Sequence, residues 1–155
     1  MKNIDLGQTL GLLANVGVIA GIVLLAYELH QNRQMMRAQT RNAISETLIG
    51  LLTLPTNSPE LNQMLQKRAA GEPLTPLERG LYIGYEGAFW RYRENVSYQY
   101  RNGLFDESEY LPQREVWIRE INTEADTREL YCGQHSSRSA AFTAEIDAFL
   151  ERPCD

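Results

Sequence analysis

Cysteine and histidine are the side chains that could carry metal or redox chemistry, and the chain has only Cys132, Cys154, His30 and His135. Cys132-Gly-Gln-His135 has a spacing that zinc sites use, but one such pair supplies half of a four-ligand site. We therefore expect no metal. The alternative is a Cys132–Cys154 disulfide, which would pin the C-terminal tail and would require an oxidising compartment.

The sequence contains few side chains arranged for acid–base catalysis. Glu86 and Glu94 fall on one expected helix, but the Glu-x-x-His pattern of a carboxylate di-metal bundle does not accompany them. No glycine-rich phosphate loop, nucleophile elbow or His-Glu-x-x-His motif occurs. The sequence predicts a non-enzymatic protein without a cofactor.

An uncharged apolar run precedes these residues. Residues 10–27 are eighteen consecutive residues without a charge, and Asn15 is their one strongly polar side chain. A helix of this length, at about 1.5 Å per residue, approaches the roughly 30 Å hydrocarbon core of a bilayer. The basic region before the run is short and the apolar core is long. The run ends in Ala26-Tyr27-Glu28-Leu29-His30, which offers no plausible cleavage site, so we expect a retained anchor rather than a signal peptide. The expected organisation is a membrane span over residues 1–30 and a soluble helical domain over residues 31–155.

The charges that flank this run predict its orientation. Lys2 precedes the run, whereas Arg33, Arg37 and Arg41 follow it. Because cytoplasmic flanks carry the excess of Lys and Arg, we expect an outside N-terminus and a cytoplasmic C-terminal domain. A disulfide predicts the opposite, since cytosolic thiols stay reduced. The two predictions exclude each other, and the charges weigh slightly more.

Small residues mark one side of the expected span. Alternating spacings of four and three residues relate Gly7, Gly11, Ala14, Val18, Gly21 and Leu25. This spacing would hold one seam toward a partner helix in left-handed packing, while Gly17-x-x-x-Gly21 offers a right-handed crossing. Asn15 lies near the seam and would add an interhelical hydrogen bond of about 0.6 kcal/mol. We expect contact with copies of the same chain in a homo-oligomer, or with other membrane-protein subunits.

Helical periodicity continues along the rest of the chain. No Gly or Pro interrupts residues 27–49, so the first helix is expected to reach about Leu52. Ser58-Pro59 and Thr75-Pro76 each place an N-cap before a first-turn proline, and the two helices that follow are expected to end near Gly71 and Gly103. Further starts are expected at a capping box over residues 106–109, at Pro112 for a helix through Ile121, and at Thr123, with a last amphipathic segment over residues 142–150.

The helix after Thr75 is expected to carry the main core face. By spacing, its inward residues are Leu77, Leu81, Tyr85, Ala88, Phe89, Tyr92, Val96 and Gln99. A neighbouring face with Gly80, Gly84 and Gly87 would let another helix approach closely. Trp90 and Arg93 lie on a second face, which predicts either contact with another protein or packing on the chain's own helices, the latter favoured. The expected fold class is all-α, with one N-terminal transmembrane helix continuing into a small helical bundle.

Charge is distributed unevenly. Residues 106–155 carry twelve Asp and Glu against five Lys and Arg, and the whole chain has a net charge of −5. No basic cluster is present, so a nucleic-acid partner is not expected. The first functional hypothesis is an interaction or accessory subunit that uses the membrane seam. The alternative is a membrane-tethered regulatory adaptor whose acidic C-terminal third docks a soluble basic partner.

Several stretches resemble a family of uncharacterised bacterial proteins with one N-terminal membrane helix and a small helical domain, frequent in marine Gram-negative bacteria. They are Gln31-Asn32-Arg33, Arg37-Ala38-Gln39-Thr40, Arg93-Glu94-Asn95-Val96-Ser97-Tyr98-Gln99-Tyr100, Gly103-Leu104-Phe105-Asp106-Glu107 and Phe142-Thr143-Ala144-Glu145-Ile146-Asp147-Ala148-Phe149. The resemblance covers most of the chain. It implies the same fold and a bacterial inner-membrane address, and it implies no activity.

Overall fold

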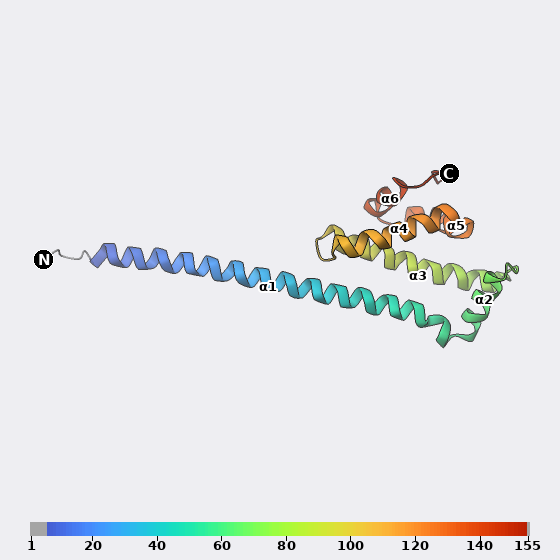
Figure 1. The fold of residues 1–155 in the computed structure, drawn as a ribbon, viewed down its shortest axis with the longest axis horizontal. Helices are drawn as coiled ribbons and strands as arrows, with labels where there is room; N and C mark the ends of the chain where they lie inside the picture. Colours follow the sequence, from blue (N-terminus) through green and yellow to red (C-terminus); the bar gives the residue numbers. More distant parts are fainter. Residues whose placement is uncertain (1–5, 155) are drawn as a thin grey trace. The chain divides into compact units, whose positions relative to one another are not determined.

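The computed structural model describes residues 6–154, and helices make up most of this range (Figure 1). In chain order they are α1 (Leu6–Asn57), α2 (Pro59–Ala69), α3 (Pro76–Arg101), α4 (Glu107–Thr123), α5 (Ala125–Gly133), a 3-10 turn η1 (His135–Ser137) and α6 (Ala140–Asp147). Residues 6–154 contain no strand, so the predicted all-α class with a long apolar N-terminal helix is confirmed. Two compact units divide the chain between Gln39 and Thr40, and the second holds the end of α1 and all later helices. Lys2 lies outside the described residues.

The helix starts that the sequence predicts at α2 and α3 are confirmed. Ser58 Oγ accepts the backbone N–H of Leu61 at 3.2 Å, ahead of Pro59. Thr75 and Glu78 form a complete capping box, in which each side chain accepts the other residue's backbone N–H. Gly103 follows α3 with a φ of 69°, a backbone conformation that glycine adopts without steric cost.

Two prolines lie inside helices, contrary to expectation. Pro55 belongs to the last turn of α1, which runs on to Asn57 instead of ending near Leu52. Pro112 lies within α4, which starts at Glu107 and not at the proline. The side-chain amide of Gln113 donates to the Glu109 carbonyl at 3.1 Å, next to the turn in which Pro112 lacks a donor. The expected capping box at residues 106–109 is also wrong, because the Asp106 side chain makes no capping hydrogen bond.

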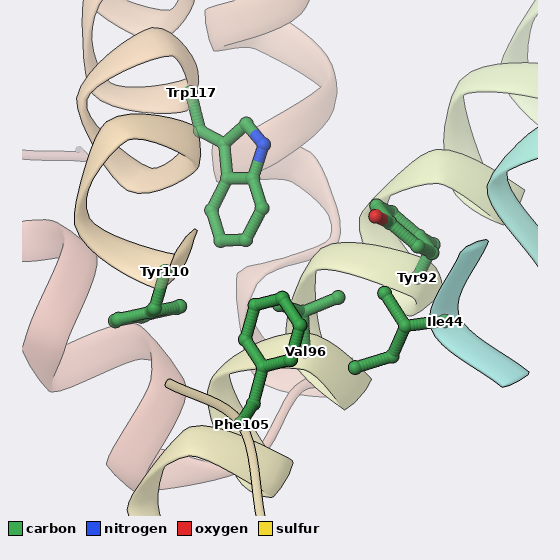
Figure 2. Packing of buried hydrophobic residues seen from close by; sticks show 6 residues of the cluster. All are labelled: Ile44, Tyr92, Val96, Phe105, Tyr110 and Trp117. Atoms are coloured by element: carbon green, nitrogen blue, oxygen red, sulfur yellow. The ribbon is translucent and has the colours of Figure 1, made fainter. Parts of the chain in front are cut away.

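One hydrophobic cluster joins the end of α1 to α3 and α4 (Figure 2). Its buried members are Ile44, Tyr92, Val96, Phe105, Tyr110 and Trp117. Ile44 is the buried residue that α1 contributes, and Leu48 and Leu51 pack beside it one and two turns later. Tyr110 also stacks on Tyr100, with ring centroids 4.2 Å apart. The last part of α1 therefore belongs to the core of the second unit.

Helix α3 is the centre of the second unit, because it contacts α2, α4, α5 and α6. It therefore buries more than one face. Tyr92 and Val96, two of the predicted inward residues, are buried. The prediction is wrong at Leu77 and Leu81, which are 77% and 39% exposed. Tyr82 is buried instead, against Leu61 and Met64 of α2. The predicted close helix approach is also absent at Gly80 and Gly84, since an added Cβ would meet no atom within 4 Å.

A half-buried carboxylate on α6 connects α6 to α3 and α4. Glu145 accepts hydrogen bonds from the hydroxyl groups of Ser97, at 2.7 Å, and Tyr110, at 2.5 Å. It also lies 3.4 Å from a guanidinium nitrogen of Arg101 and 3.5 Å from one of Arg114. Burial raises the pKa of the Tyr110 phenol, and the hydrogen bond to Glu145 raises it further. This network fixes α6 against α3 and α4.

Truncation of this carboxylate is expected to destabilise the second unit. Glu145→Ala leaves two buried hydroxyl groups and Arg114 without their acceptor, so we expect a loss of about 3 kcal/mol in the free energy of unfolding. Glu145→Gln keeps one acceptor oxygen and should lose less. The measurement is urea unfolding of the full chain in mild detergent, followed by tryptophan fluorescence, because both tryptophans lie in the second unit. Glu115→Ala, on the exposed side of α4, is the control; equal midpoints for it and Glu145→Ala would contradict the role of the network.

Stability should also depend on pH through Glu78. The hydrogen bond from Lys67, followed by those from Thr75, lowers the pKa of Glu78 from 4.5 to about 2. A carboxyl group whose folded pKa is depressed contributes stability above its unfolded pKa and loses that contribution as the pH falls through its folded pKa. The urea midpoint of Glu78→Gln should therefore lie below that of the parent chain at pH 7. The difference between the two midpoints should shrink as the pH falls from 4.5 to 2. A difference that stays constant over this range would contradict the assignment.

Candidate interaction surfaces

The apolar part of α1 exposes nearly all of its large side chains. Twelve of them are between 56% and 69% exposed, namely Leu10, Leu12, Leu13, Val16, Val18, Ile19, Ile22, Val23, Leu24, Leu25, Tyr27 and Leu29. By length and composition this helix could cross a membrane, and a signal sequence near an N-terminus has the same features. Removing a side chain of this size from water is worth about 1.5–3 kcal/mol. Exposure of this surface to water is therefore costly, and the helix is a candidate membrane span.

The glycines of the predicted seam have open space around them. An added Cβ at Gly11, Gly17 or Gly21 would meet no atom within 4 Å, apart from the helix's own backbone. Gly7, Ala14 and Asn15 are exposed as well. No steric contact within the described chain therefore requires a small residue at Gly11, Gly17 or Gly21. The structure contains no partner helix, so the predicted contact stays a prediction.

Trp90 and Arg93 do not form an exposed contact surface. Their exposed fractions are 1% and 7%, so the prediction of contact with another protein is wrong and packing on the chain's own helices is confirmed. Trp90 packs against Tyr131 and Phe142, with ring centroids 5.0 and 6.4 Å away. Burial on this side of α3 follows because α5 and α6 also cover it.

Two guanidinium groups lie against the Trp90 ring. The Arg93 guanidinium carbon is 4.4 Å from the ring centroid and that of Arg138 is 5.0 Å away, both within cation–π range. Arg93 also pairs with Glu120 at 2.6 Å, and Arg138 donates to the Tyr131 carbonyl at 2.9 Å. Burial lowers the pKa of both arginines. These contacts explain why two arginines are buried in the core, which their residue type does not predict.

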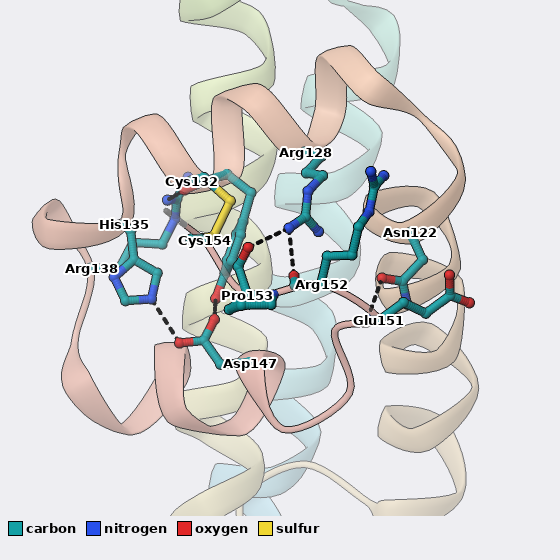
Figure 3. Close-up of a disulfide and its surroundings, with 11 residues drawn as sticks. Asn122, Arg128, Cys132, His135, Arg138, Asp147, Glu151, Arg152, Pro153 and Cys154 are labelled. Carbon is teal, nitrogen blue, oxygen red and sulfur yellow. Dashed lines mark hydrogen bonds and ion pairs between the residues drawn. A yellow bond between two sulfur atoms is a disulfide. The ribbon is translucent and has the colours of Figure 1, made fainter.

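The two cysteines meet at the end of the chain (Figure 3). Cys132, in the last turn of α5, bonds to Cys154 with an S–S distance of 2.00 Å and a Cα–Cα distance of 5.3 Å. The bond closes a loop with a sequence separation of 22 residues. Closure of a loop of this size stabilises a fold by about 3 kcal/mol in the chain-entropy account.

The residues between α6 and Cys154, which we call the C-terminal strap (residues 148–154), have no helix or strand of their own. Arg128 donates to the backbone carbonyls of Arg152 and, at 2.6 Å, Pro153. The Asn122 amide bonds to the Phe149 carbonyl and accepts the Glu151 N–H, both at 3.1 Å. The sequence did not reveal these anchors, because single exposed polar residues on helices leave no periodic signal.

The other chemistry-bearing residues serve structural contacts. His135 Nε2 lies 2.8 Å from Asp147, which also accepts the Tyr131 hydroxyl at 2.7 Å. Burial would raise the pKa of Glu94, but hydrogen bonds from Ser139 and Arg91 outweigh it, so the pKa of Glu94 is lowered. Burial raises the pKa of Glu86. No group of three His, Cys, Asp or Glu residues in the described range could hold a metal ion.

A cavity of about 250 Å³ that the sequence did not predict lies between α2, α3 and α5. Its lining includes Arg68, whose guanidinium carbon lies 4.6 Å above the Tyr82 ring, and the ion pair Arg79–Glu129. Burial, followed by the nearby Glu86 charge, raises the pKa of Tyr82 to about 12. The phenol therefore stays neutral at physiological pH, and the cavity offers no activated nucleophile or base from this residue.

Comparison of the chain with protein-family models, with curated proteins and with solved structures finds no match in any of the three.

Proposed function

We propose that this chain is held in a membrane by the apolar part of α1 and acts as a non-enzymatic interaction or accessory subunit. In this proposal the small-residue seam contacts other helices within the bilayer, either in a homo-oligomer or in a larger membrane complex. The bacterial inner membrane is the proposed location.

The observation that carries the proposal is the exposure of the apolar side chains between Leu10 and Leu29. A core helix of a water-soluble protein would bury such residues, whereas here the most apolar window of α1 has no buried residue. A bilayer covers this surface without any further protein. A cleaved signal sequence is the competing account, and the lack of a small-x-small site at the end of the apolar run, over residues 26–30, favours a retained span.

The seam adds a reason for helix contact. In lipid there is no hydrophobic gain when two apolar helices pair, so close backbone approach and interhelical hydrogen bonds favour association. Gly11, Gly17 and Gly21 would permit that approach, and their space is open. Asn15 is exposed and would supply a hydrogen-bonding group near the same seam.

The adaptor alternative draws less support from the structure, because many acidic residues of the C-terminal third already have partners within the chain. Glu109 pairs with Arg41, Glu120 with Arg93, Glu129 with Arg79, and Glu145 with Arg101 and Arg114. Such carboxylates are less available to a soluble basic partner than the sequence count indicates. The membrane seam is therefore the preferred contact surface.

Enlarging the seam residues is expected to weaken association. Leucine at Gly11 or Gly21 places a branched side chain where two backbones would meet, so the dissociation constant of the oligomer should rise at least about tenfold, equivalent to 1.4 kcal/mol. Native mass spectrometry of the full chain from mild detergent measures the populations of monomer and oligomer across a dilution series.

Ala20→Leu is the matched control, because it introduces the same side chain on the helix face opposite the seam. We expect the control to associate like the parent chain. A strictly monomeric parent chain that also co-purifies with no other membrane protein would contradict the proposal. Equal effects of Gly21→Leu and Ala20→Leu would show that the seam has no special role.

A further inference from the structure

We infer that the second unit, residues 40–155, lies on the oxidising side of the membrane, where the Cys132–Cys154 disulfide locks the C-terminal strap. The inference rests on the proposed function, because the second unit has a side of the membrane only if α1 spans it. It reverses the orientation that the flanking arginines favour. It also places any partner of the second unit outside the cytoplasm.

The first support is the meeting of the two cysteines. The chain has two cysteines, and the fold brings both to one place although 22 residues separate them. The Cα–Cα distance of 5.3 Å falls in the range that disulfides occupy. Cys132 belongs to a helix of the core, while Cys154 has no helix or strand around it, so the bond connects the end of the strap to a fixed element.

The second support is that, apart from the disulfide, few contacts hold the strap in place. Its polar contacts come from Asn122 and Arg128 and lie at the exposed surface. Exposed hydrogen bonds of this kind contribute little to stability, because water replaces them when they break. Leu150 and Cys154 are half-buried against the cluster around Trp90 and Ile121. The Arg114 guanidinium also lies 4.7 Å from the ring centroid of Phe149, which is 47% exposed. A reduced strap would keep these non-covalent contacts but lose its covalent bond to α5, so its observed position fits a compartment in which the disulfide persists.

The arginines after the span indicate a cytoplasmic second unit less strongly than their number suggests. Arg41 forms an ion pair with Glu109 of α4 at 2.8 Å, which gives this arginine a place in the folded second unit whichever side that unit occupies. The remaining excess is Arg33 and Arg37 against Lys2. A difference of one positive charge between the two flanks does not decide the orientation when a whole domain follows the span, because such domains are translocated largely regardless of charge.

Formation of the bond needs a thiol oxidant, and compartments outside the cytosol supply one as the disulfide of an oxidoreductase. The Cys132 and Cys154 thiols lose their two S–H bonds and form one S–S bond. The two electrons and two protons pass to the oxidant, whose disulfide becomes a dithiol. The exchange is balanced without a metal or another cofactor.

Thiol labelling in intact cells tests the inference directly. The full chain is expressed in a Gram-negative host, cells are quenched in acid, and free thiols are labelled with a maleimide of large mass. We expect no label before reduction and two labels after it. The single variants Cys132→Ser and Cys154→Ser are the matched controls, and each should show one label with or without reduction. Two labels before reduction in the parent chain would overturn the inference.

Protease treatment of spheroplasts then reports the side of the membrane. We expect the second unit to be cut from outside without lysis of the inner membrane, and full protection until lysis would overturn the inference. The same fractions separate this result from the proposed function. A chain found in the soluble fraction would refute the membrane role, while the labelling count would still decide whether the disulfide forms.

Discussion

The exposed apolar surface of α1 is the constraint on which the rest of the account depends. Burying one leucine-sized side chain is worth about 1.5–3 kcal/mol, whereas the whole stability of a domain is only about 5–15 kcal/mol. Twelve such side chains more than half exposed cannot remain in water without another phase or protein to cover them. The proposed membrane span would satisfy this constraint, and the small residues along the same helix would then be open to contact with neighbouring helices.

Polar contacts between helices hold much of the second unit together. Its polar residues enter the core in pairs, as Glu145 does with Ser97 and Tyr110, and as Arg93 does with Glu120 beside Trp90. Such contacts restrict how the helices can be arranged, although Arg93 Nη1 and Trp90 Nε1 have no hydrogen-bond partner within the described residues. The disulfide does the same for the C-terminal strap.

Local signals in the sequence were sufficient for the fold class and for the starts of α2 and α3, because Ser58 and Thr75 cap helices through contacts within three residues. They failed where tertiary packing decides. Pro112 is tolerated inside α4 because the core holds the rest of that helix. Local spacing also does not indicate the pairing of Arg93 with Glu120, which lies 27 positions away. The seam glycines are recognisable by spacing, but the sequence does not say which helix, if any, they contact.

The most direct test of the central claim is the intact mass of the chain in carbonate-washed membranes. The account predicts the full 155-residue chain in the membrane pellet, because a retained helix resists extraction at high pH. A soluble chain that has lost its apolar N-terminal segment would show that the segment is a cleaved signal. A full-length chain released by carbonate would show that the helix lies on the membrane rather than across it, and either result would contradict the account.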